Sequence, residues 1–597
     1  MDRRKLLKSA LFLPLAGLAP SGLARAIDGL TALRSRLRPG SPDWPGATEW
    51  SRLDAAVGGR LLRPVSPFSA KAAPTKRAEA LAHLKNPYYL GDEPALTQTS
   101  GWADAWRSSV SPYAVAATSS RDVAAAVNFA RQHRLRLAIK GGGHSYQGTS
   151  NAPDSLLIWT RRMNAVTLHD DFVPAGTTVA PQHAVSVGSG ALWADAYDAV
   201  TTRGGRYVQG GGCMTVGVAG LVQSGGFGSF SKRWGTAAGN VLEAEVVTAD
   251  GQVRIANAAT HPDLFWAIKG GGGGSIGVIT RLTLRTFELP ETFGAVFGSI
   301  RARTPEAYRA LVAKALDFYR TALFNPNWGE QMRFAHGETL GISMVFQGIS
   351  RADAERIWAP FSEWVKSRDD LVVDRRIEAM ALPARHFWDA EFFRQHAPGL
   401  MVDDDREGAA RHHVLWAGDQ DQVGWFIHAY QSAWLPSQLL SDARRSELVD
   451  AICETSRQWD MALHFNKGLG GADPAAIERA RDTATHPQML DAFALAIIAA
   501  SGDPAFPGMA DPDLAEARHR AKGVERAMNT LRRVAPDAGS YVSESNYFER
   551  DWQRSHWGAN YPRLARVKAK YDPDGLFTVH HGVGSERWNS DGFDPMR

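Results

Sequence analysis

Two glycine-rich stretches organise this chain: Lys140-Gly-Gly-Gly-His-Ser-Tyr-Gln-Gly-Thr-Ser150 and Gln209-Gly-Gly-Gly-Cys-Met-Thr-Val-Gly-Val-Ala-Gly-Leu-Val-Gln-Ser-Gly-Gly-Phe-Gly-Ser229. Each places one nucleophilic side chain, His144 or Cys213, in backbone that has almost no other side chains. Glycine costs conformational entropy on folding, so this density is typical of loops whose N–H groups approach a ligand closely or whose residues adopt positive φ. The two stretches therefore predict a site for a bulky, phosphate-bearing ligand.

The residues around these stretches predict an α+β domain over about 110–289. Ser119 begins a capping-box pattern at the start of a helix. The run 136–140 alternates like a half-buried strand and leads directly into the first glycine stretch. Further predicted elements are a strand over 241–248, its hairpin return over 252–256, a short helix over 261–269 and a closing strand over 276–287.

The rest of the chain divides by composition. Residues 27–109 are punctuated by proline, and we expect an extended lead that wraps the main body. Over 290–535 glycine thins out and strand patterns alternate with helical ones, which predicts a second α+β domain. The segment 536–597 contains a helical pattern over 560–571 that begins with proline in its first turn.

Length and composition are those of a multidomain globular protein. The 597 residues exceed one ordinary core, and 44% of them are hydrophobic and 22% charged. A net charge of +4 gives no case for nucleic acid or an acidic partner. The 19 tryptophans suggest aromatic walls around planar or sugar-like ligands, with the filling of a large core as the alternative.

Residues 1–26 have the features of an export signal. The pair Arg3-Arg4 precedes an apolar run over 10–18 and the small-residue site Ala24-Arg-Ala26, which is typical of the twin-arginine route to the periplasm or exterior. The apolar run is too short to span a bilayer permanently, although an uncleaved anchor remains the alternative. No other segment reaches transmembrane length, so we expect no stable membrane insertion after the signal is removed.

Taken alone, the two nucleophiles leave several interpretations open. A histidine in a tight loop is also typical of a structural hydrogen-bonding residue, and Cys213 of a buried hydrophobe or a disulfide partner of Cys453. Zinc is disfavoured because only two ligands and no Cys-x-x-Cys spacing are present, and no metal site is expected. The run Gly272–Gly277 has the letters of a dinucleotide fingerprint, but a helix precedes it and a strand follows, which argues against a Rossmann site.

Four ordered motifs resemble the berberine-bridge-enzyme-like group of FAD-linked oxidases in the vanillyl-alcohol-oxidase/p-cresol-methylhydroxylase (PCMH) superfamily. They are Lys140-Gly-Gly-Gly-His-Ser, Gly211-Gly-Cys-Met-Thr-Val-Gly-Val-Ala-Gly220, Asp263-Leu-Phe-Trp-Ala-Ile-Lys-Gly-Gly-Gly, and Trp557-Gly-Ala-Asn-Tyr-Pro-Arg-Leu564 continuing to Lys570-Tyr-Asp-Pro-Asp-Gly-Leu-Phe577. The resemblance is close over 110–290, good over 541–585 and loose between them. It implies an α+β fold with a PCMH-type FAD-binding domain over 110–289, a substrate domain over 290–535, and a C-terminal segment that returns to the flavin site.

The resemblance also implies bicovalent FAD. In that family the histidine matching His144 is joined to the flavin 8α-methyl carbon and the cysteine matching Cys213 to ring position 6. An imidazole nitrogen and a thiolate are competent nucleophiles toward an electron-poor ring. We expect the neighbouring loop amides to lower the pKa of Cys213.

The implied reaction is hydride transfer from a C–H bond next to a hydroxyl or amine to flavin N5, with a base taking the heteroatom proton. The expected substrate is a small alcohol, either a sugar or an aromatic secondary metabolite, and molecular oxygen is the expected acceptor. Val216 favours an oxidase because many family oxidases have a small residue there that leaves oxygen access, although a core valine is the alternative. The rivals are a dehydrogenase with another acceptor and a catalytically idle flavin- or carbohydrate-binding protein.

The catalytic base departs from the family pattern. Many members have Tyr-x-Asn-Tyr, with the second tyrosine as base, whereas this chain has Tyr541-Val-Ser543-Glu544. We predict Glu544 as the base because an ionised carboxylate accepts a proton readily. A structural role for Glu544 is the alternative, Tyr541 and Tyr547 are the reserve candidates, and the departure leaves the substrate class open.

The remaining expectation concerns cofactor contacts. We expect FAD to contact Gly141, Gly142, Gly143, His144, Ser145, Ser150, Cys213, Gly217, Gly220, Ser224, Gly225, Gly226, Gly277 and Asn560.

Overall fold

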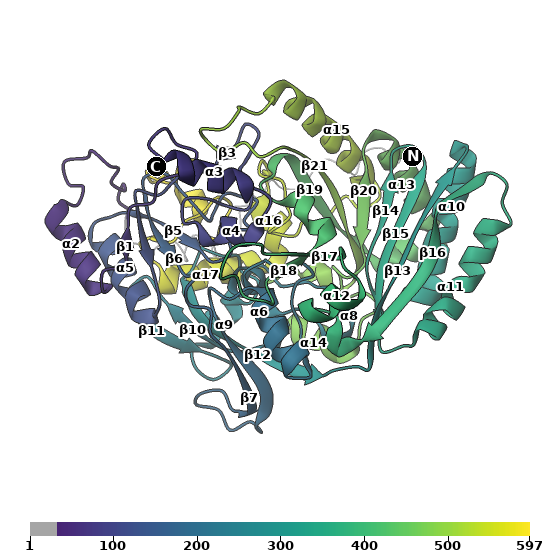
Figure 1. Ribbon diagram of the computed structural model, residues 1–597, viewed down its shortest axis with the longest axis horizontal. Coiled ribbons are helices and arrows are strands. Elements are labelled where there is room, and N and C mark those ends of the chain that lie inside the picture. The colour runs from purple at the N-terminus through teal and green to yellow at the C-terminus, as the bar shows by residue number, and fades with distance from the viewer. Residues whose placement is uncertain (1–32, 597) are drawn as a thin grey trace, which may run out of the picture.

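The computed structural model describes residues 33–596, which form two α+β lobes with the C-terminal segment against both (Figure 1). The predicted export signal over 1–26 lies outside the described residues. Within the described part of the chain, no helix is both long and apolar enough to cross a membrane.

The first lobe contains the two glycine stretches and is built on two sheets. The four-stranded sheet has the order β1 (Leu61–Leu62), β4 (Tyr113–Ala116), β6 (Ser155–Trp159), β5 (Arg136–Lys140). The larger sheet has the order β11 (Val253–Ala256), β10 (Val241–Val247), β12 (Val278–Glu288), β8 (Gln182–Gly188), β7 (Val166–Phe172), and β9 (Arg206–Val208) also pairs with β12. The larger sheet is antiparallel, as hairpin-connected strands require.

Helix α5 (Ser120–Gln132) joins the two sheets into one core. Ser119 caps it as predicted, since its hydroxyl accepts from the amide of Asp122 and the carboxylate of Asp122 accepts from the amide of Ser119. The apolar face of α5 packs with Val115 and Ile158 from one sheet and with residues of β10 and β12 from the other. The first glycine stretch, which follows β5 directly, is therefore attached to a well-packed core.

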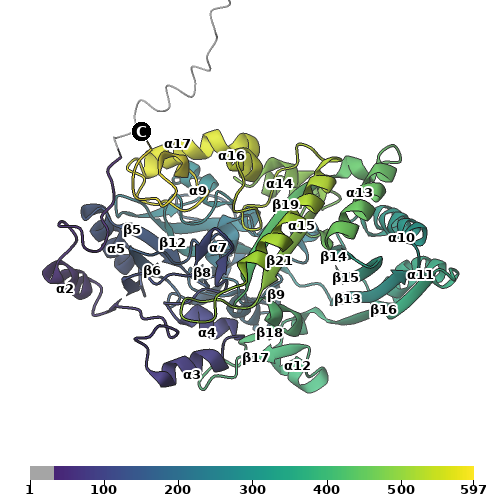
Figure 2. The ribbon, with the colours of Figure 1, turned by 90° about the horizontal axis from the view of Figure 1, so that it is seen from above.

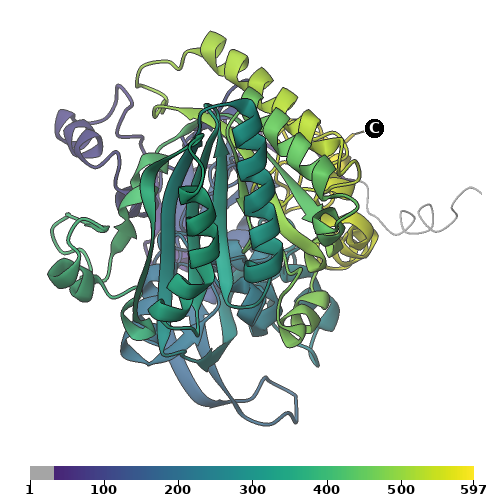
Figure 3. The same ribbon diagram turned by 90° about the vertical axis from the view of Figure 1, so that its right-hand side faces the viewer.

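The second lobe is one large sheet covered by helices. Its strand order is β16 (Leu371–Pro383), β13 (Thr292–Ala302), β15 (Thr339–Gln347), β14 (Trp328–Ala335), β20 (Met461–His464), β21 (Ala492–Gly502), β19 (Phe426–Pro436), β2 (Gly101–Trp102), β3 (Trp106–Arg107). Helices α10 (Pro305–Phe318), α11 (Arg351–Lys366), α13 (Arg445–Gln458) and α15 (Leu514–Arg532) cover its outer face (Figure 3). The opposite face, with Trp434 and Tyr430, looks toward the first lobe and the C-terminal segment.

The described part of the N-terminal segment differs from the extended lead that was predicted. It forms helices α2 (Ala47–Ala56), α3 (Pro74–Ala82) and α4 (Pro87–Asp92). Strand β1 adds to a sheet of the first lobe, whereas β2 pairs in parallel with β19 of the second. The proline-rich composition hid these elements because proline also begins short helices, as it does in α3 and α4. The second lobe is therefore not confined to 290–535.

The remaining short elements flank the two lobes. They are α6 (Trp193–Tyr197), α7 (Val218–Gln223), α8 (Ser231–Trp234), α9 (Pro262–Ile268), α12 (Ala390–His396), α14 (Pro474–Arg481), and the β17 (Met401–Asp403) and β18 (Val414–Trp416) pair. At the C-terminus, α16 (Trp552–Trp557) and α17 (Tyr561–Tyr571) lie beside α9 on the first lobe (Figure 2). The C-terminal segment thus returns to the glycine loops, as the family resemblance implied.

Lys140, the first residue of the first glycine stretch, is fully buried. Its ammonium donates to the backbone carbonyls of Leu90, Glu93 and Leu96 at 3.3, 2.7 and 2.5 Å. A buried amine of this kind is stable only when its donors are satisfied. The contacts tie α4 and the turn after it to the start of the glycine loop.

Replacing Lys140 by Met should loosen this turn, because three buried carbonyls lose their donor at a cost of about 3 kcal/mol. Amide hydrogen exchange over 87–98 should then be about 100-fold faster than in the parent protein. Lys76→Met on the exposed face of α3 is the matched control, since its ion pair with Glu79 lies in solvent. Equal exchange in the two variants would contradict the assigned role.

Candidate active site

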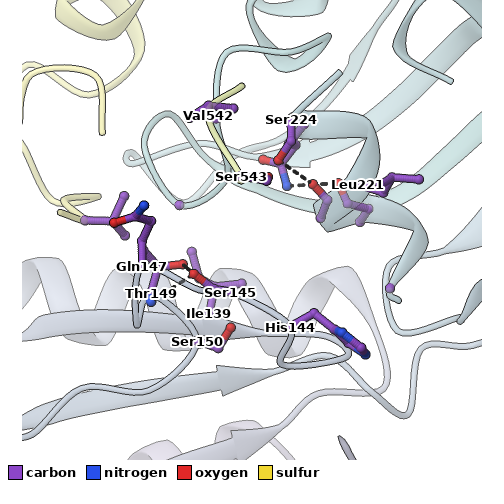
Figure 4. A pocket seen from close by; sticks show the side chains of 18 of the residues that line it. Ile139, His144, Ser145, Gln147, Thr149, Ser150, Leu221, Ser224, Val542 and Ser543 are labelled. Atoms are coloured by element: carbon purple, nitrogen blue, oxygen red, sulfur yellow. Dashed lines mark hydrogen bonds between the residues drawn. The ribbon is translucent and has the colours of Figure 1, made fainter. Parts of the chain in front are cut away.

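A cleft lies where the glycine loops of the first lobe meet the C-terminal segment. Its atom-free space is about 1500 Å³ when the open mouth is included. One wall is the first glycine stretch from Gly141 to Ser150, and the facing wall is the region around α7 with Leu221 and Ser224 (Figure 4). Residues 272–275 and 277–279 of the first lobe and residues 541–544, 556–557 and 579–582 of the C-terminal segment also line it.

The two glycine stretches touch each other through bare backbone. A Cβ atom on Gly142 would lie 3.0 Å from the amide nitrogen of Gly217, and one on Gly217 would lie 3.1 Å from the amide nitrogen of Gly142. Gly143 has a φ of +80°, which residues with side chains rarely adopt. Close backbone contact therefore accounts for Gly142 and Gly217, and a positive φ accounts for Gly143. The absence of side chains leaves the loop N–H groups unshielded.

Thr215 links the two predicted nucleophiles. Its hydroxyl oxygen lies 3.2 Å from Nε2 of His144 and 3.4 Å from Sγ of Cys213. The two side chains come from different loops but converge on this one oxygen. Thr215 lies inside the quoted stretch, but no property of a lone threonine pointed to this role.

Burial sets the ionisation of His144 and Cys213. Burial lowers the pKa of His144 to about 4, so the ring is neutral near pH 7 and keeps a nitrogen lone pair. Burial, followed by the charge of Asp419, raises the pKa of Cys213 to about 12. The prediction of a lowered cysteine pKa is wrong: the hydroxyl and amide of Thr215 act in the predicted direction, but more weakly than burial. Both Cys213 and Cys453 are free thiols, which excludes the disulfide alternative.

Glu544 lies in the cleft wall and is held by Lys467. The ammonium of Lys467 is 2.6 and 2.7 Å from the two carboxylate oxygens, and the side chains are only 14% and 16% exposed. A partly buried pair with both oxygens engaged holds the carboxylate in one orientation. Sequence reasoning missed Lys467 because it lies in the region where the family resemblance is loosest.

The two reserve tyrosines differ in position. Tyr541 lines the cleft, but burial and the charge of Glu544 raise the pKa of its phenol, which makes it a poor base. Tyr547 lies outside the cleft lining, and its ring stacks on His580 with centroids 3.6 Å apart. Glu544 is therefore the best placed of the three candidates.

The predicted cofactor contacts divide into two groups. The cleft lining contains Gly141, Gly142, Gly143, His144, Ser145, Ser150, Gly217, Gly220, Ser224 and Gly277. Cys213, Gly225, Gly226 and Asn560 are outside that lining. Thr215 connects Cys213 to His144 of the lining. The amide of Asn560 donates to the carbonyls of Thr483 and Thr485 and holds the start of α17.

Three histidines of the C-terminal segment also line the cleft: His556, His580 and His581. Neither ring nitrogen of His556, nor Nδ1 of His581, has a hydrogen-bond partner among the described residues. Burial lowers the pKa of His556 to about 3, so the ring is neutral. Such buried polar atoms are normally satisfied, and here a bound cofactor can satisfy them.

Comparison with known proteins agrees with this geometry. A family model described as FAD binding domain matches residues 111–257, and one described as Berberine and berberine like matches residues 536–584. The FAD-linked oxidoreductase easE of Trichophyton verrucosum is 31% identical over 94% of this chain and 92% of its own length. The chain belongs to the FAD-linked oxidoreductases. The predicted family and enzyme class are confirmed.

Solved structures confirm the predicted PCMH-type fold. The VAO-type flavoprotein MtVAO615 from Myceliophthora thermophila superposes with a TM-score of 0.76 at 25% identity, covering 93% of this chain and 98% of that one. Glucooligosaccharide oxidase from Acremonium strictum superposes with a TM-score of 0.62 at 19% identity, covering 82% of this chain and 94% of that one. The oxidoreductase therefore binds FAD, and the glycine loops and unpartnered histidines of its cleft fit that cofactor.

Two glycines of the cleft allow a direct test of whether the glycine loops hold FAD. A Cβ on Gly220 meets nothing within 4 Å and projects from a helix that lines the cleft, whereas one on Gly142 meets Gly217. Gly220→Ala should leave folding intact, since alanine is the better helix former, yet lower FAD affinity by about tenfold or more through loss of space. Gly142→Ala should lower both thermal stability and FAD content. Titration of the apoprotein with FAD measures the affinity, and wild-type affinity in Gly220→Ala would contradict a role of the glycine loops in holding FAD.

Proposed function

We propose that this FAD-linked oxidoreductase is an oxidase that removes a hydride from a C–H bond next to a hydroxyl, with FAD held by His144 and Cys213 and dioxygen as the final acceptor. The convergence of these two nucleophiles on Thr215 is the observation that supports the proposal most strongly. The bound flavin supplies the hydride acceptor. The chain's own residues attach it, orient the substrate and take up the proton.

Double attachment is supported by an analogous solved structure. The Acremonium strictum glucooligosaccharide oxidase is described as having a 6-S-cysteinyl, 8α-N1-histidyl FAD. In this chain a neutral imidazole and a free thiol occupy neighbouring loops at the cleft. A neutral imidazole is the nucleophilic form of histidine, so the low pKa of His144 favours attachment over a wide pH range.

The proton acceptor we propose is Glu544. It is the carboxylate of the cleft lining, and Lys467 holds it in one orientation through both oxygens. A carboxylate fixed in this way accepts the hydroxyl proton while the hydride leaves the neighbouring carbon. The pair of Glu544 and Lys467 takes the place of the base tyrosine that many family members use.

An alcohol substrate and dioxygen are the finer parts of the proposal. Two of the solved structures with this fold are a glucooligosaccharide oxidase and a chitooligosaccharide oxidase, which supports a sugar-like alcohol. Val216 lines the cleft next to the glycine loops, which supports access of oxygen to the bound flavin. A dehydrogenase is the second candidate, and stopped-flow reoxidation in air separates the two because a dehydrogenase reoxidises slowly.

Acid precipitation tests the attachment. We expect the flavin to remain with the precipitated wild-type protein, because two covalent bonds hold it. His144→Ala and Cys213→Ala should each retain colour, and the double variant should lose it. Release of the flavin from the precipitated wild type would contradict covalent attachment.

Anaerobic flavin reduction tests the base. With the alcohol that bleaches the wild type fastest in a panel of sugars and aromatic alcohols, Glu544→Gln should slow reduction by about 100-fold or more, because the amide cannot accept a proton. Flavin content should not change. Tyr541→Phe and Tyr547→Phe are the matched controls and should stay within about threefold of wild type. A large loss in Tyr541→Phe together with normal reduction in Glu544→Gln would assign the base to the tyrosine instead.

A further inference from the structure

Cys213 faces a chemical obstacle that the fold itself creates. Thioether formation needs the thiolate, but burial and the charge of Asp419 raise the pKa of this thiol to about 12. Thr215, its hydrogen-bonding neighbour, is a neutral hydroxyl and cannot take the proton at neutral pH. A proton acceptor close to the sulfur is therefore required.

The carboxylate of Asp419 occupies that position. It lies on η5 (Ala417–Gln422), a short 3-10 turn between β18 and β19, close enough to Cys213 that the two groups interact directly. Its Oδ2 atom is buried and has no hydrogen-bond partner among the described residues. An unpartnered buried carboxylate oxygen is costly in a folded protein and commonly marks a functional site.

Other charged groups of the region set the state of Asp419. Burial, with a smaller contribution from the charge of Glu330, raises the pKa of Asp419 to about 6, although the contact with Cys213 acts in the opposite direction. The carboxylate is thus mostly ionised at neutral pH while its thiol neighbour is protonated. A pKa near the working pH suits a general base. The phenols of Tyr146 and Tyr197 also interact electrostatically with Cys213, but burial raises the pKa of both.

The loop that presents Asp419 is anchored away from the cleft. Asp195 Oδ1 lies 2.9 Å from Nε2 of His412 and 3.2 Å from Nε2 of His413, which holds the strand before η5 against α6. Asp404 pairs with Arg406 at 2.7 Å in the same loop. These contacts hold the chain that leads into the turn against the first lobe.

We propose that Asp419 is the proton acceptor that activates Cys213 for attachment to FAD. This inference rests on the proposed bicovalent attachment. The S–H bond of Cys213 and the C–H bond at ring position 6 break, and an S–C bond forms between them. Asp419 takes the thiol proton, and the two electrons and two protons released overall pass to dioxygen, which leaves as hydrogen peroxide.

The test uses the full-length protein produced in riboflavin-starved cells and then incubated with FAD in air. Peptide mass spectrometry measures, over time, the fraction of Cys213 and of His144 that is joined to flavin. In Asp419→Asn we expect Cys213 linkage to form at least about tenfold more slowly than in wild type, while the His144 linkage forms normally. The normal His144 linkage also shows that the variant is folded. Asp421→Asn, two residues further on and exposed, is the matched control and should behave as wild type.

The pH profile separates a proton acceptor from a merely structural residue. Wild-type Cys213 linkage should slow as the pH falls through about 6, where Asp419 becomes protonated. Linkage in Asp419→Asn should instead rise about tenfold per pH unit above 7, because only the spontaneously ionised thiol reacts. Asp419→Glu should recover part of the rate. The profile of the wild type alone keeps the test decisive if a variant fails to fold.

The outcomes are distinct. Cys213 linkage in Asp419→Asn at the wild-type rate and with the wild-type pH profile would overturn this inference and leave bicovalent attachment intact. Wild-type protein that links flavin through His144 alone would instead contradict the proposed double attachment, and this inference with it.

Discussion

The contact between two bare backbones, Gly142 against Gly217, is the constraint on which the rest of the site depends. It brings together two loops that are separated by about 75 residues in sequence, and a Cβ on either glycine would lie only 3.0 or 3.1 Å from the facing amide nitrogen. His144 lies two residues after Gly142 on one loop. Cys213 and Thr215 lie shortly before Gly217 on the other loop. Their convergence is therefore a consequence of main-chain packing, and the cleft beside it keeps loop N–H groups available for phosphate.

Burial then assigns different chemistry to the two nucleophiles. The same loss of solvent lowers the pKa of His144 and raises the pKa of Cys213, because it disfavours the charged form of each. The histidine becomes the reactive neutral imidazole without help, whereas the thiol becomes less reactive. A site that uses both needs a separate proton acceptor for the sulfur, and Asp419 is placed for that role.

Much of the fold and half of the chemistry can be predicted from the sequence, for identifiable reasons. The capping box at Ser119, the strand into the first glycine stretch and the family motifs are local patterns, and local patterns survive in the structure. The N-terminal segment was misjudged because β2 is stable only as an added strand beside β19, which no local pattern reveals. The pKa of Cys213 was predicted in the wrong direction because burial is a property of the packed loops. Lys467 and Asp419 were missed since both come from the middle of the chain, where long-range packing alone brings them to the cleft.

The central claim is that one flavin joins the two glycine stretches. Trypsin cleavage after Lys140 and Arg161, and after Arg206 and Lys232, separates peptides that contain His144 and Cys213. The account predicts that peptides 141–161 and 207–232 from the native holoenzyme are recovered as a single species whose mass is that of both peptides plus one flavin, less the four hydrogens lost when the two bonds form. Recovery of the two peptides separately, with an unmodified thiol in one and an unmodified imidazole in the other, would contradict it.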